Sequence, residues 1–319
     1  MDSTEQNKHN YSRRKFIQTG TLTGMGVLFG SSIFANSEPM VDFLKKYTVT
    51  LGAITYSFRS LPDSVDNLIK YCNEAGIKAI ELMGDTVENF AGRPAPQNGA
   101  QRAASNIAIR NWRESVAMDK FIEFRKLMDQ ASISVYAFKP SALEKDNSDG
   151  EVAYALKVGK ILGAKSLTVE LPRDAAQSLR LGKLAEAHQM FIGYHAHTQA
   201  TDTAWDVALA QSPGNSMNLD CGHYIAAGGN NTKESLLALI EKKHDRITSM
   251  HLKDRLSKDH GGANVVWGKG DTPITEIITL VKKKKYPIPM SIELEYDIPK
   301  NSDAVKEVKR CVDFAKEYV

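Results

Sequence analysis

The sequence predicts a (β/α)8 TIM barrel, a single α/β domain in which strands and helices alternate after an N-terminal leader. Three observations support this prediction. Eight short apolar runs, each typical of a buried parallel strand, recur along the chain. Amphipathic stretches of helical period separate these runs. No glycine-rich dinucleotide loop follows the first run, which disfavours the alternative, an open doubly wound sheet.

The composition is that of an ordinary globular protein. The 319 residues are 42% hydrophobic and 25% charged, and the formal net charge is +3. Residues 1–37 carry four basic and two acidic residues, so the remainder carries 37 basic and 36 acidic residues. This balance gives no reason to expect a nucleic-acid partner. The three cysteines are far apart in the sequence, which disfavours a disulfide framework or a zinc ribbon.

Residues 1–37 resemble a twin-arginine signal peptide, which directs the export of folded proteins. Arg13 and Arg14 precede Phe16 and an uncharged, moderately apolar stretch, and small residues at positions 35 and 37 fit a signal-peptidase site. The alternative is a membrane anchor that is never cleaved, but the apolar stretch is short for a membrane span. The leader predicts an exported, periplasmic protein that has no membrane association after the leader is removed.

The eight predicted strands follow one another at regular intervals. They span residues 49–58, 77–84, 133–140, 164–172, 190–199, 216–224, 247–254 and 290–297. The clearest helical periods span residues 64–76, 118–131, 151–164, 233–243 and 302–319. Gly76 is expected to end the first of these helices, and Ser302 is expected to cap the last. The barrel domain therefore runs from residue 48 to residue 319.

One connection, residues 85–112, is too long for a simple turn and shows no clear period. It follows the second predicted strand, so it belongs to the carboxyl-terminal face of the barrel, where enzymes of this fold carry their active sites. Long connections are usually functional lids or disordered segments. We expect this connection to be an ordered lid over a site.

Ionisable residues gather where the predicted strands end. They are Glu81, Lys139, Glu170, His195, His197, Asp220, His223, His251, Lys253, Asp254, Glu293 and Glu295. Successive side chains of a strand point to opposite faces, so the pairs 195/197, 251/253 and 293/295 each share one face. The residues between the members of each pair are apolar and suit the side that faces the helices. The polar side chains are therefore predicted to point into the barrel mouth, the space at the carboxyl ends of the strands.

Ionisable groups in a dry barrel mouth are costly if they stay unpaired, and a shared cation removes that cost. Carboxylate oxygens together with imidazole nitrogens suit Mn²⁺, Co²⁺ or Zn²⁺, and the absence of cysteine among them disfavours a structural zinc site. Any one of these residues alone is more often a hydrogen-bonded residue of the rim. Their recurrence over strands four to eight predicts one bound divalent ion.

The motifs at the strand ends resemble those of the xylose isomerase-like barrels, also called the sugar phosphate isomerase/epimerase family. They are GAITYSFR (52–59), GIKAIELMG (76–84), NLDCGHY (218–224), SMHLKD (249–254), WGKGD (267–271) and SIELEY (291–296). The resemblance covers the chain from about residue 48 to its end. The Asp-x-x-His of strand six, the His of strand seven and the Glu-Tyr of strand eight are specific when they occur in this order.

The resemblance implies a bound metal ion, with Mn²⁺ expected first and Zn²⁺, Co²⁺ or Mg²⁺ as alternatives. In that family the ligands come from strands five to eight, and Asp220, His251 and Glu295 match the last three. The strand-five ligand is usually Glu, but here His195 occupies that position, and Glu170 of the neighbouring strand is the alternative. In the family's 3-epimerases, the strand-five and strand-eight Glu residues act as an acid/base pair. With His195 in place of the strand-five Glu, this pair is incomplete here.

The resemblance and the strand-end positions together suggest roles for the remaining residues. The candidates for a catalytic acid or base are Glu295, Lys253, His197 and Glu170. The candidates for substrate contacts are His223, Glu81, Lys139 and Glu293. Of these, Lys139 and Glu293 suit a structural ion pair equally well.

We therefore expect a metal-dependent sugar isomerase or epimerase that acts through an enediolate on a free sugar, a keto-sugar or a sugar derivative. Export disfavours a phosphorylated substrate. One alternative is a lyase or hydrolase that removes the aglycone of a 3-keto-glycoside, and another is a non-catalytic exported sugar-binding barrel. An endonuclease IV-like enzyme shares the barrel, but the charge balance and the leader disfavour it. Barrels of this kind often pair, so a homo-oligomer is consistent with the resemblance.

Overall fold

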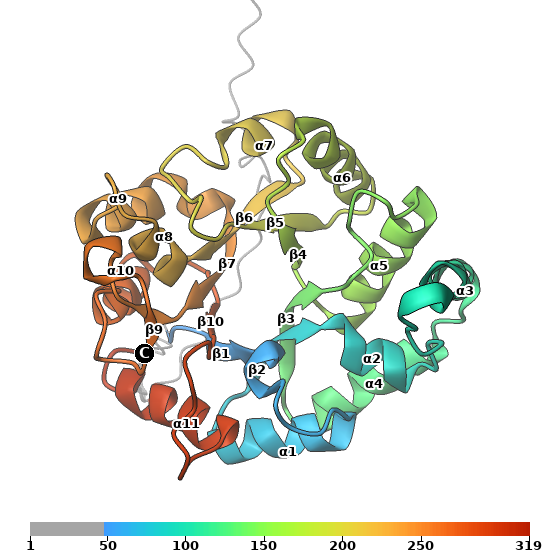
Figure 1. Cartoon of the computed structure of the whole chain (residues 1–319), viewed down its shortest axis with the longest axis horizontal. Coiled ribbons are helices and arrows are strands. Elements are labelled where there is room, and N and C mark those ends of the chain that lie inside the picture. The colour runs from blue at the N-terminus through green and yellow to red at the C-terminus, as the bar shows by residue number, and fades with distance from the viewer. Residues whose placement is uncertain (1–47) are drawn as a thin grey trace, which may run out of the picture. The chain divides into compact units, whose positions relative to one another are not determined.

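Eight parallel strands close into a barrel, which confirms the predicted fold class. The computed structural model describes residues 48–319, and the predicted signal peptide lies outside these residues. The strands follow one another around the barrel in the order β1-β10-β7-β6-β5-β4-β3-β2, and β1 pairs with both β10 and β2 (Figure 1). Their bounds are Leu51–Ile54 (β1), Ala79–Met83 (β2), Ser134–Lys139 (β3), Ser166–Glu170 (β4), Phe191–His195 (β5), Asn215–Asp220 (β6), Ile247–Leu252 (β7) and Met290–Ile292 (β10). Each of them falls within a predicted strand or within one residue of it.

Helices surround the barrel in the sequence positions between the strands (Figure 1). The α-helices are α1 (Val65–Ala75), α2 (Gly84–Phe90), α3 (Arg102–Ser115), α4 (Asp119–Gln130), α5 (Asp149–Leu162), α6 (Ala175–Ala187), α7 (Asp206–Gln211), α8 (Cys221–Ala227), α9 (Lys233–Lys243), α10 (Ile274–Lys284) and α11 (Ala304–Ala315). The short 3-10 helices are η1 (Thr55–Phe58), η2 (Gly99–Gln101), η3 (His244–Arg246) and η4 (Lys258–His260). None of the helices between residues 48 and 319 has both the length and the apolar character needed to span a membrane.

The ends of the first and last helices show how local sequence sets their bounds. Gly76 ends α1 with a φ of +77°, a left-handed conformation that glycine adopts without steric cost, as predicted. The predicted cap of α11 was wrong by one residue. Asp303, not Ser302, caps this helix, because its side chain accepts the backbone N–H of Lys306 at 2.9 Å. Ser302 instead contacts the buried carboxylate of Glu307.

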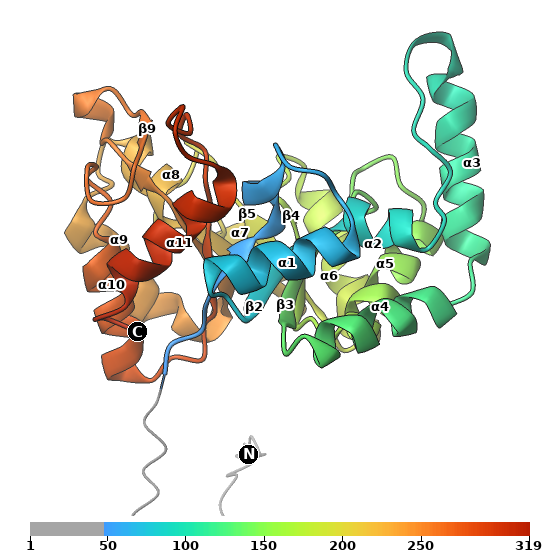
Figure 2. The same ribbon diagram turned by 90° about the horizontal axis from the view of Figure 1, so that it is seen from below.

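The long connection at residues 85–112 is ordered, but it does not cover the barrel mouth. It contains most of α2, the turn η2 and most of α3. Helix α3 contacts α5 and stands at the edge of the barrel, where it rises beside the mouth (Figures 1 and 2). A buried guanidinium holds its base, because Arg113 donates to Glu88 of α2 and to Glu151 of α5. The expected lid is therefore an arm at the rim.

A short antiparallel hairpin beside the mouth was not predicted. Its strands are β8 (Asp254–Arg255) and β9 (Asn264–Val265), which are too short to leave a pattern in the sequence. The carboxylate of Asp254 accepts the backbone N–H groups of Gly268 and Gly270, at 2.8 and 2.9 Å, and so organises the loop that follows the hairpin. Asp254 therefore has a structural role at the rim. Figure 2 shows the hairpin on the same side of the barrel as the raised end of α3.

One layer of the barrel interior, directly below the mouth, is made of hydrogen-bonding side chains. Barrels of this fold usually fill the interior with Val, Ile and Leu. Here the layer consists of Glu81, Thr168, Asn218, Ser249 and Ser291, and each of these residues is 0% exposed. Four of these residues, all except Glu81, lie two positions before an ionisable residue of the mouth on the same face, because side chains alternate along a strand. Glu81 lies at the same depth on β2.

Candidate metal centre and active site

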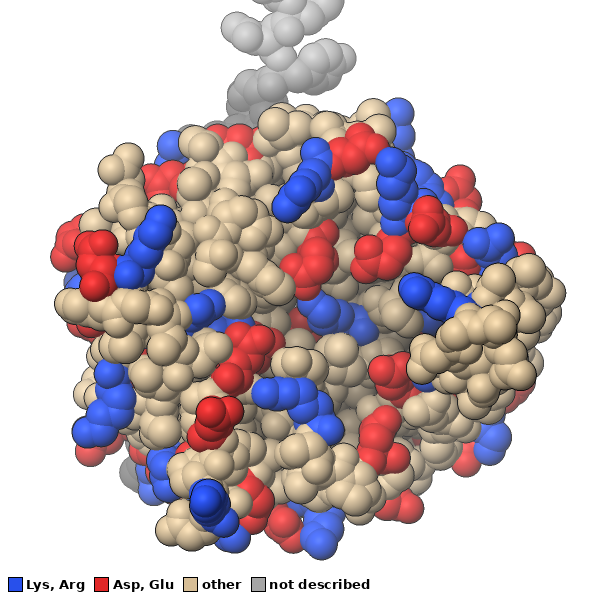
Figure 3. Space-filling model, in the orientation of Figure 1, with Lys and Arg blue, Asp and Glu red and all other residues tan. Residues whose placement is uncertain are grey.

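The structure brings the predicted site residues together at the carboxyl ends of the strands. Side chains of β5, β6 and β7 supply the centre of the cluster, and residues that follow β10 supply one side of it. In space-filling view, acidic and basic side chains surround a hollow near the centre of this face (Figure 3). We refer below to the mouth cluster, which consists of Glu81, Lys139, Glu170, His195, His197, Asp220, His223, His251, Lys253, Glu293 and Glu295.

Three of these residues form a group that fits a metal ion. His195, Asp220 and His251 are buried, and their ligand atoms all lie within 4.8 Å of one another. Asp220 Oδ2 lies 3.8 Å from His195 Nε2 and 3.7 Å from His251 Nδ1. Donors that bind one ion at about 2.0–2.2 Å are separated by about 3–4 Å, so the spacing is suitable. The same Oδ2 is buried and accepts no hydrogen bond from the described residues, although the ammonium of Lys253 lies 3.0 Å away, so it retains capacity to bind a cation.

Glu293, rather than Glu295, lies beside this group. Strand β10 ends at Ile292, so Glu293 is the first residue after the strand and Glu295 lies two residues farther along. Glu293 Oε2 is 2.9 Å from His251 Nδ1. Glu295 keeps 26% of its side chain exposed and contacts Lys253 instead. Neither glutamate belongs to the three-residue group, but Glu293 contacts one of its members directly, whereas Glu295, the expected strand-eight ligand, does not.

Of the two alternatives for the strand-five ligand, only His195 joins the group. Glu170 lies at the outer end of β4 with 45% of its side chain exposed. Its two oxygens contact Lys139 Nζ at 2.9 Å and His197 Nε2 at 3.3 Å. Neither the fully buried Asp220 nor His251 is among its partners. Glu170 is therefore an accessible carboxylate of the mouth, positioned by one lysine and one histidine.

Lys253 is the buried cation of the cluster. Its Nζ lies 3.0 Å from Asp220 Oδ2, 2.7 Å from Glu293 Oε2 and 2.7 Å from Glu295 Oε2. Burial alone would lower the pKa of Lys253, but the three carboxylates outweigh burial and raise it. Gly222 makes room for this lysine, because a Cβ at that position would lie 2.4 Å from Lys253 Cγ. Lys253 therefore carries a positive charge in the mouth.

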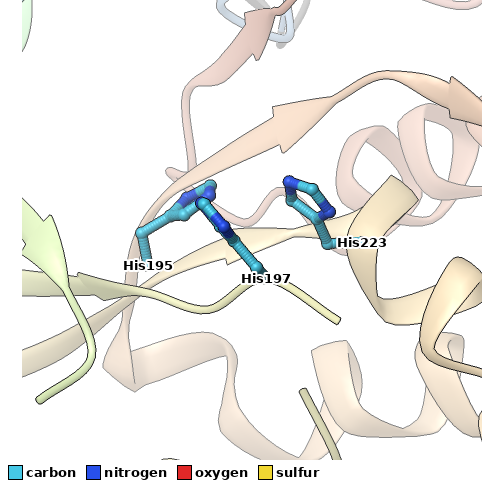
Figure 4. Close-up of side chains that lie close together, drawn as sticks. All are labelled: His195, His197 and His223. Carbon is cyan, nitrogen blue, oxygen red and sulfur yellow. The ribbon is translucent and has the colours of Figure 1, made fainter. Parts of the chain in front are cut away.

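Three imidazoles line the other side of the same space (Figure 4). The ring of His197 stacks on that of His223 with centroids 4.5 Å apart, and His195 meets His197 edge-on at 5.0 Å. The ligand atoms of these three rings also lie within 4.8 Å of one another. Burial, followed by the charge of Lys253, lowers the pKa of His223 to about 2. His223 is therefore neutral and suited to hydrogen bonding.

Glu81, an expected substrate contact, lies among protein groups in this structure. Its side chain is completely buried below the mouth, and Oε2 lies 2.9 Å from His251 Nε2. Burial alone would raise the pKa of Glu81, but the charge of His251 outweighs burial and lowers it. Burial alone would lower the pKa of His251, but the carboxylates of Glu81 and Glu293 raise it to about 10. Glu81 is thus the hydrogen-bonding partner of His251, which is a candidate metal ligand.

Carboxylates outnumber ammonium groups in the mouth cluster. The carboxylates belong to Glu81, Glu170, Asp220, Glu293 and Glu295, and the ammonium groups belong to Lys139 and Lys253. Burial raises the pKa of Asp220 to about 6, although the ammonium of Lys253 opposes this shift. Excess negative charge in a poorly solvated space favours a bound cation. The donor set, oxygen and nitrogen without sulfur, suits Mn²⁺, Co²⁺, Zn²⁺ or Mg²⁺.

Two polar residues of the site were missed by the sequence analysis. Asn218 precedes Asp220 by two residues on β6, so the period-two rule could have placed it on the same inward face. Its Oδ1 lies 2.9 Å from His195 Nδ1. Arg255 donates to the ring of His223 and to the carbonyl of Gly262. Its position depends on the hairpin β8–β9, which leaves no signal in the sequence.

Comparisons with known proteins agree with this geometry. A family model described as xylose isomerase-like TIM barrel matches residues 69–317. No curated protein matches the chain. A xylose isomerase domain protein from Planctomyces limnophilus superposes with a TM-score of 0.59 at 13% identity, over 86% of this chain and 97% of that one.

Two further solved structures are similar in fold. A xylose isomerase-like TIM barrel protein from Mycobacterium smegmatis, in complex with magnesium, has a TM-score of 0.56 at 12% identity, over 86% of this chain and 97% of that one. The 3-keto-D-glucoside 4-epimerase of E. coli has a TM-score of 0.57 at 11% identity, over 85% and 100%. At these identities the likeness shows the fold alone. The match of the family model, which spans most of the described chain, shows more: this protein belongs to the xylose isomerase-like TIM barrel family.

Proposed function

We propose that the protein is a metal-dependent isomerase or epimerase that moves a proton beside the carbonyl of a keto-sugar. One observation carries this proposal. Glu170 is the last residue of β4 and Glu295 follows β10, and these strands are four places apart in a ring of eight. The two accessible carboxylates of the mouth therefore lie on opposite sides of the candidate metal group. Moving a proton from one face or one carbon to another requires such a pair of acid and base groups.

Each of these carboxylates has a charged neighbour that holds it in place. Lys139 Nζ is 2.9 Å from Glu170 Oε1, and Lys253 Nζ is 2.7 Å from Glu295 Oε2. In the proposed reaction, one carboxylate takes the proton from the carbon beside the carbonyl, and the group across the mouth returns a proton. His197, 3.3 Å from Glu170, can carry the proton between that carboxylate and solvent.

The residues that would hold the metal are His195, Asp220, His251 and Glu293. When bound there, a divalent ion supplies positive charge where negative charge develops on the carbonyl oxygen. The chain contributes positive charge of its own through Lys253, whose donors point at the same space. The neutral ring of His223 suits contact with a sugar hydroxyl, and Arg255 orients that ring. A substrate rich in hydroxyl groups fits this mixture of donors and acceptors.

Two observations support an unphosphorylated sugar as the substrate. The predicted signal peptide would place the enzyme outside the cytoplasm, where phosphorylated metabolites are scarce. The basic side chains of the mouth are paired with carboxylates, so they do not form a free phosphate site. The keto-glucoside 4-epimerase among the similar structures acts on a substrate of the class that we propose.

Solvent exchange provides the test. The protein is incubated with Mn²⁺ and with free or 3-oxidised sugars in deuterated water, and the sugars are analysed by NMR. We expect deuterium to appear at a carbon beside the carbonyl, and we expect no such incorporation when a chelator is present. Sugar binding that does not depend on metal, without any exchange, would instead identify a non-catalytic sugar-binding barrel and overturn the proposal.

A second candidate function is favoured by a cavity near the mouth. This cavity of about 310 Å³ is lined by residues that follow β1 and by residues at the end of β2. Its wall includes Tyr56, Phe58 and Met83, and Met83 lies two residues after Glu81 on the same face of β2. An apolar aglycone attached to a sugar in the mouth fits such a neighbour. The candidate function is a lyase acting on 3-keto-glycosides.

The lyase reaction uses the same first step. A base removes the proton from the carbon between the carbonyl and the anomeric carbon, and the electron pair forms a double bond to the anomeric carbon. The aglycone leaves with the electrons of the glycosidic bond and takes up a proton from an acid of the mouth. Release of free aglycone from an aryl 3-keto-glycoside distinguishes this reaction from epimerisation, which leaves the glycoside intact.

A further inference from the structure

The buried carboxylate of Glu81 occupies the centre of the polar layer below the mouth. Oε1 accepts the hydroxyl of Thr168 at 2.7 Å. Oε2 lies within hydrogen-bonding distance of three groups, Asn218 Nδ2 at 3.2 Å, Ser291 Oγ at 3.1 Å and His251 Nε2 at 2.9 Å. Burying a charge at this depth costs free energy, and the four polar neighbours of Glu81 offset that cost. Because no substrate reaches this carboxylate, its role must lie in its effect on these neighbours.

The first consequence concerns His251. A carboxylate can only accept hydrogen bonds, so the Nε2 that faces Glu81 must carry a hydrogen. Nδ1 lies 3.7 Å from Asp220 Oδ2 and 2.9 Å from Glu293 Oε2, on the side of the candidate metal position. Because Glu293 also only accepts, both ring nitrogens carry a hydrogen before a metal ion binds, and an ion bound at Nδ1 would displace the hydrogen there. Glu81 keeps the other hydrogen on Nε2 and thus selects the tautomer that presents Nδ1 to the metal.

The second consequence concerns His195, which Glu81 does not touch. Asn218 links the two residues, and its amide could in principle be oriented either way. Because Glu81 only accepts, the NH₂ group of Asn218 must face Glu81, and Oδ1 must face His195 Nδ1 at 2.9 Å. The hydrogen of the neutral His195 ring is then on Nδ1. Its free nitrogen is Nε2, which lies 3.8 Å from Asp220 Oδ2.

We propose that Glu81, directly and through Asn218, sets the tautomers of both imidazoles of the candidate metal centre, so that His251 offers Nδ1 and His195 offers Nε2 to one ion. Glu81 is a positioning residue in this scheme, because it touches neither substrate nor metal. The inference rests on the metal centre of the proposed function, but it does not depend on which reaction is catalysed.

The test compares two substitutions that each replace a buried carboxylate with an amide. Glu81→Gln removes the acceptor-only group below the metal centre. Glu307→Gln is the matched control, because Glu307 is also 0% exposed and contacts Tyr296 and Arg310 away from the site. Binding of Mn²⁺ and Zn²⁺ is measured by calorimetry. We expect a loss of about 10–100-fold in metal affinity for Glu81→Gln and no change for Glu307→Gln.

Nuclear magnetic resonance of the ring nitrogens separates positioning from mere support of the fold. In the ¹⁵N-histidine-labelled, Zn²⁺-loaded protein, coordination through Nδ1 of His251 and through Nε2 of His195 is expected. Glu81→Gln should alter the signals of both rings. Asn218→Leu should alter those of His195 alone, and it keeps the test available should Glu81→Gln fail to fold.

The outcomes distinguish this inference from the proposed function. If the parent protein binds neither ion, the metal centre itself is absent, and the proposed function fails with it. If the parent binds metal and Glu81→Gln matches the parent in affinity and in ring signals, only the positioning role of Glu81 is overturned.

Discussion

Two clusters of buried charge in this protein are balanced in different ways. The first, which we call the arm network, lies at the base of α3 and consists of Glu88, Arg93, Arg110, Arg113 and Glu151. There Arg113 Nε and Nη2 donate to the two oxygens of Glu88 at 2.9 and 3.0 Å, and its Nη1 reaches Glu151 at 3.1 Å. Arg93 adds a second guanidinium to Glu88 at 2.8 Å. In the second, the mouth cluster, carboxylates exceed ammonium groups, and Asp220 Oδ2, 3.0 Å from Lys253 Nζ, accepts no hydrogen bond from the described residues.

The difference separates a structural network from one prepared for a ligand. The three guanidinium groups of the arm network give each of its two carboxylates a paired positive charge, so neither carboxylate needs a further cation, although Arg93 Nε has no hydrogen-bond partner among the described residues. The mouth cluster has suitable donor atoms and too little positive charge, so it becomes balanced when a cation binds. The same kind of substitution should therefore affect stability in the arm network and metal binding or turnover in the mouth cluster.

The largest effect is expected when the buried cation of each cluster is removed. Lys253→Met should reduce turnover by about 10²–10⁴-fold, because the group that holds Glu295 and supplies charge to the mouth is lost. Metal affinity should stay equal or rise, since the carboxylates keep their charge. Arg113→Met should leave turnover of the folded protein unchanged. Steady-state kinetics and metal titration of the two variants measure these effects. If Lys253→Met turned over substrate as fast as the parent protein, the role of Lys253 would be structural alone.

Neutralising a carboxylate of the arm network should be costly for stability. In Glu88→Gln the buried guanidinium of Arg113 loses its main partner, and we expect a loss of about 3–5 kcal/mol in the free energy of unfolding. Urea denaturation followed by circular dichroism measures this change. Metal affinity should be unaltered, so a drop in affinity would show that the two clusters are coupled.

The corresponding change in the mouth should affect metal binding instead. Asp220→Asn keeps an oxygen to accept the backbone N–H of His223 but removes the carboxylate charge. We expect metal affinity to fall at least about 100-fold, while the stability of the metal-free protein changes by less than about 1 kcal/mol. Calorimetry and urea denaturation of the metal-free protein test the two statements separately. A strongly destabilised Asp220→Asn would mean that both clusters are structural.

Adding metal should stabilise the parent protein through the mouth cluster. At a free concentration 100 times the dissociation constant, one bound ion contributes about 2.7 kcal/mol. For a domain of this size, the melting temperature should rise by roughly 5–10 °C. Scanning calorimetry with and without Mn²⁺ measures the shift. Glu88→Gln should show the same increment, and Asp220→Asn should show none.

The smallest effect is a pH dependence that belongs to the arm network. Burial alone would raise the pKa of Glu151, but hydrogen bonds from Asn147, Ser148 and Arg113 outweigh burial and lower it from its usual 4.5. A group with a lowered folded-state pKa adds stability above the unfolded pKa, and this stability is lost as the pH falls through the folded pKa. The parent should therefore lose stability below about pH 4.5 more steeply than Glu151→Gln. Urea midpoints over this range provide the measurement.

The barrel could be predicted because its strands repeat a strong local signal. Each strand is a short apolar run, and the alternation of its side chains also placed His251 and Asp220 on the inward face. The choice between Glu293 and Glu295 could not be made in this way, because both share that face. It depends on where β10 ends, and strand ends are uncertain by several residues in sequence.

Other features depend on tertiary packing. The arm stands at the rim because Arg113 ties α3 to helices α2 and α5, and these contacts join residues far apart in sequence. Glu81 was assigned to substrate because it stands near the end of a strand. Its depth in the barrel, and hence its role below His251, follows from the register of β2 with its neighbours.

The pairing of β1 with β10 has a consequence for biosynthesis. Glu81 comes from the second strand and Glu293 from the last, so the donors and their support meet only when the ring closes. A nascent chain on the ribosome cannot complete the centre until β10 and Glu293 have emerged from the exit tunnel. Loading with metal should thus follow the synthesis of β10 and, if the leader acts as predicted, precede translocation.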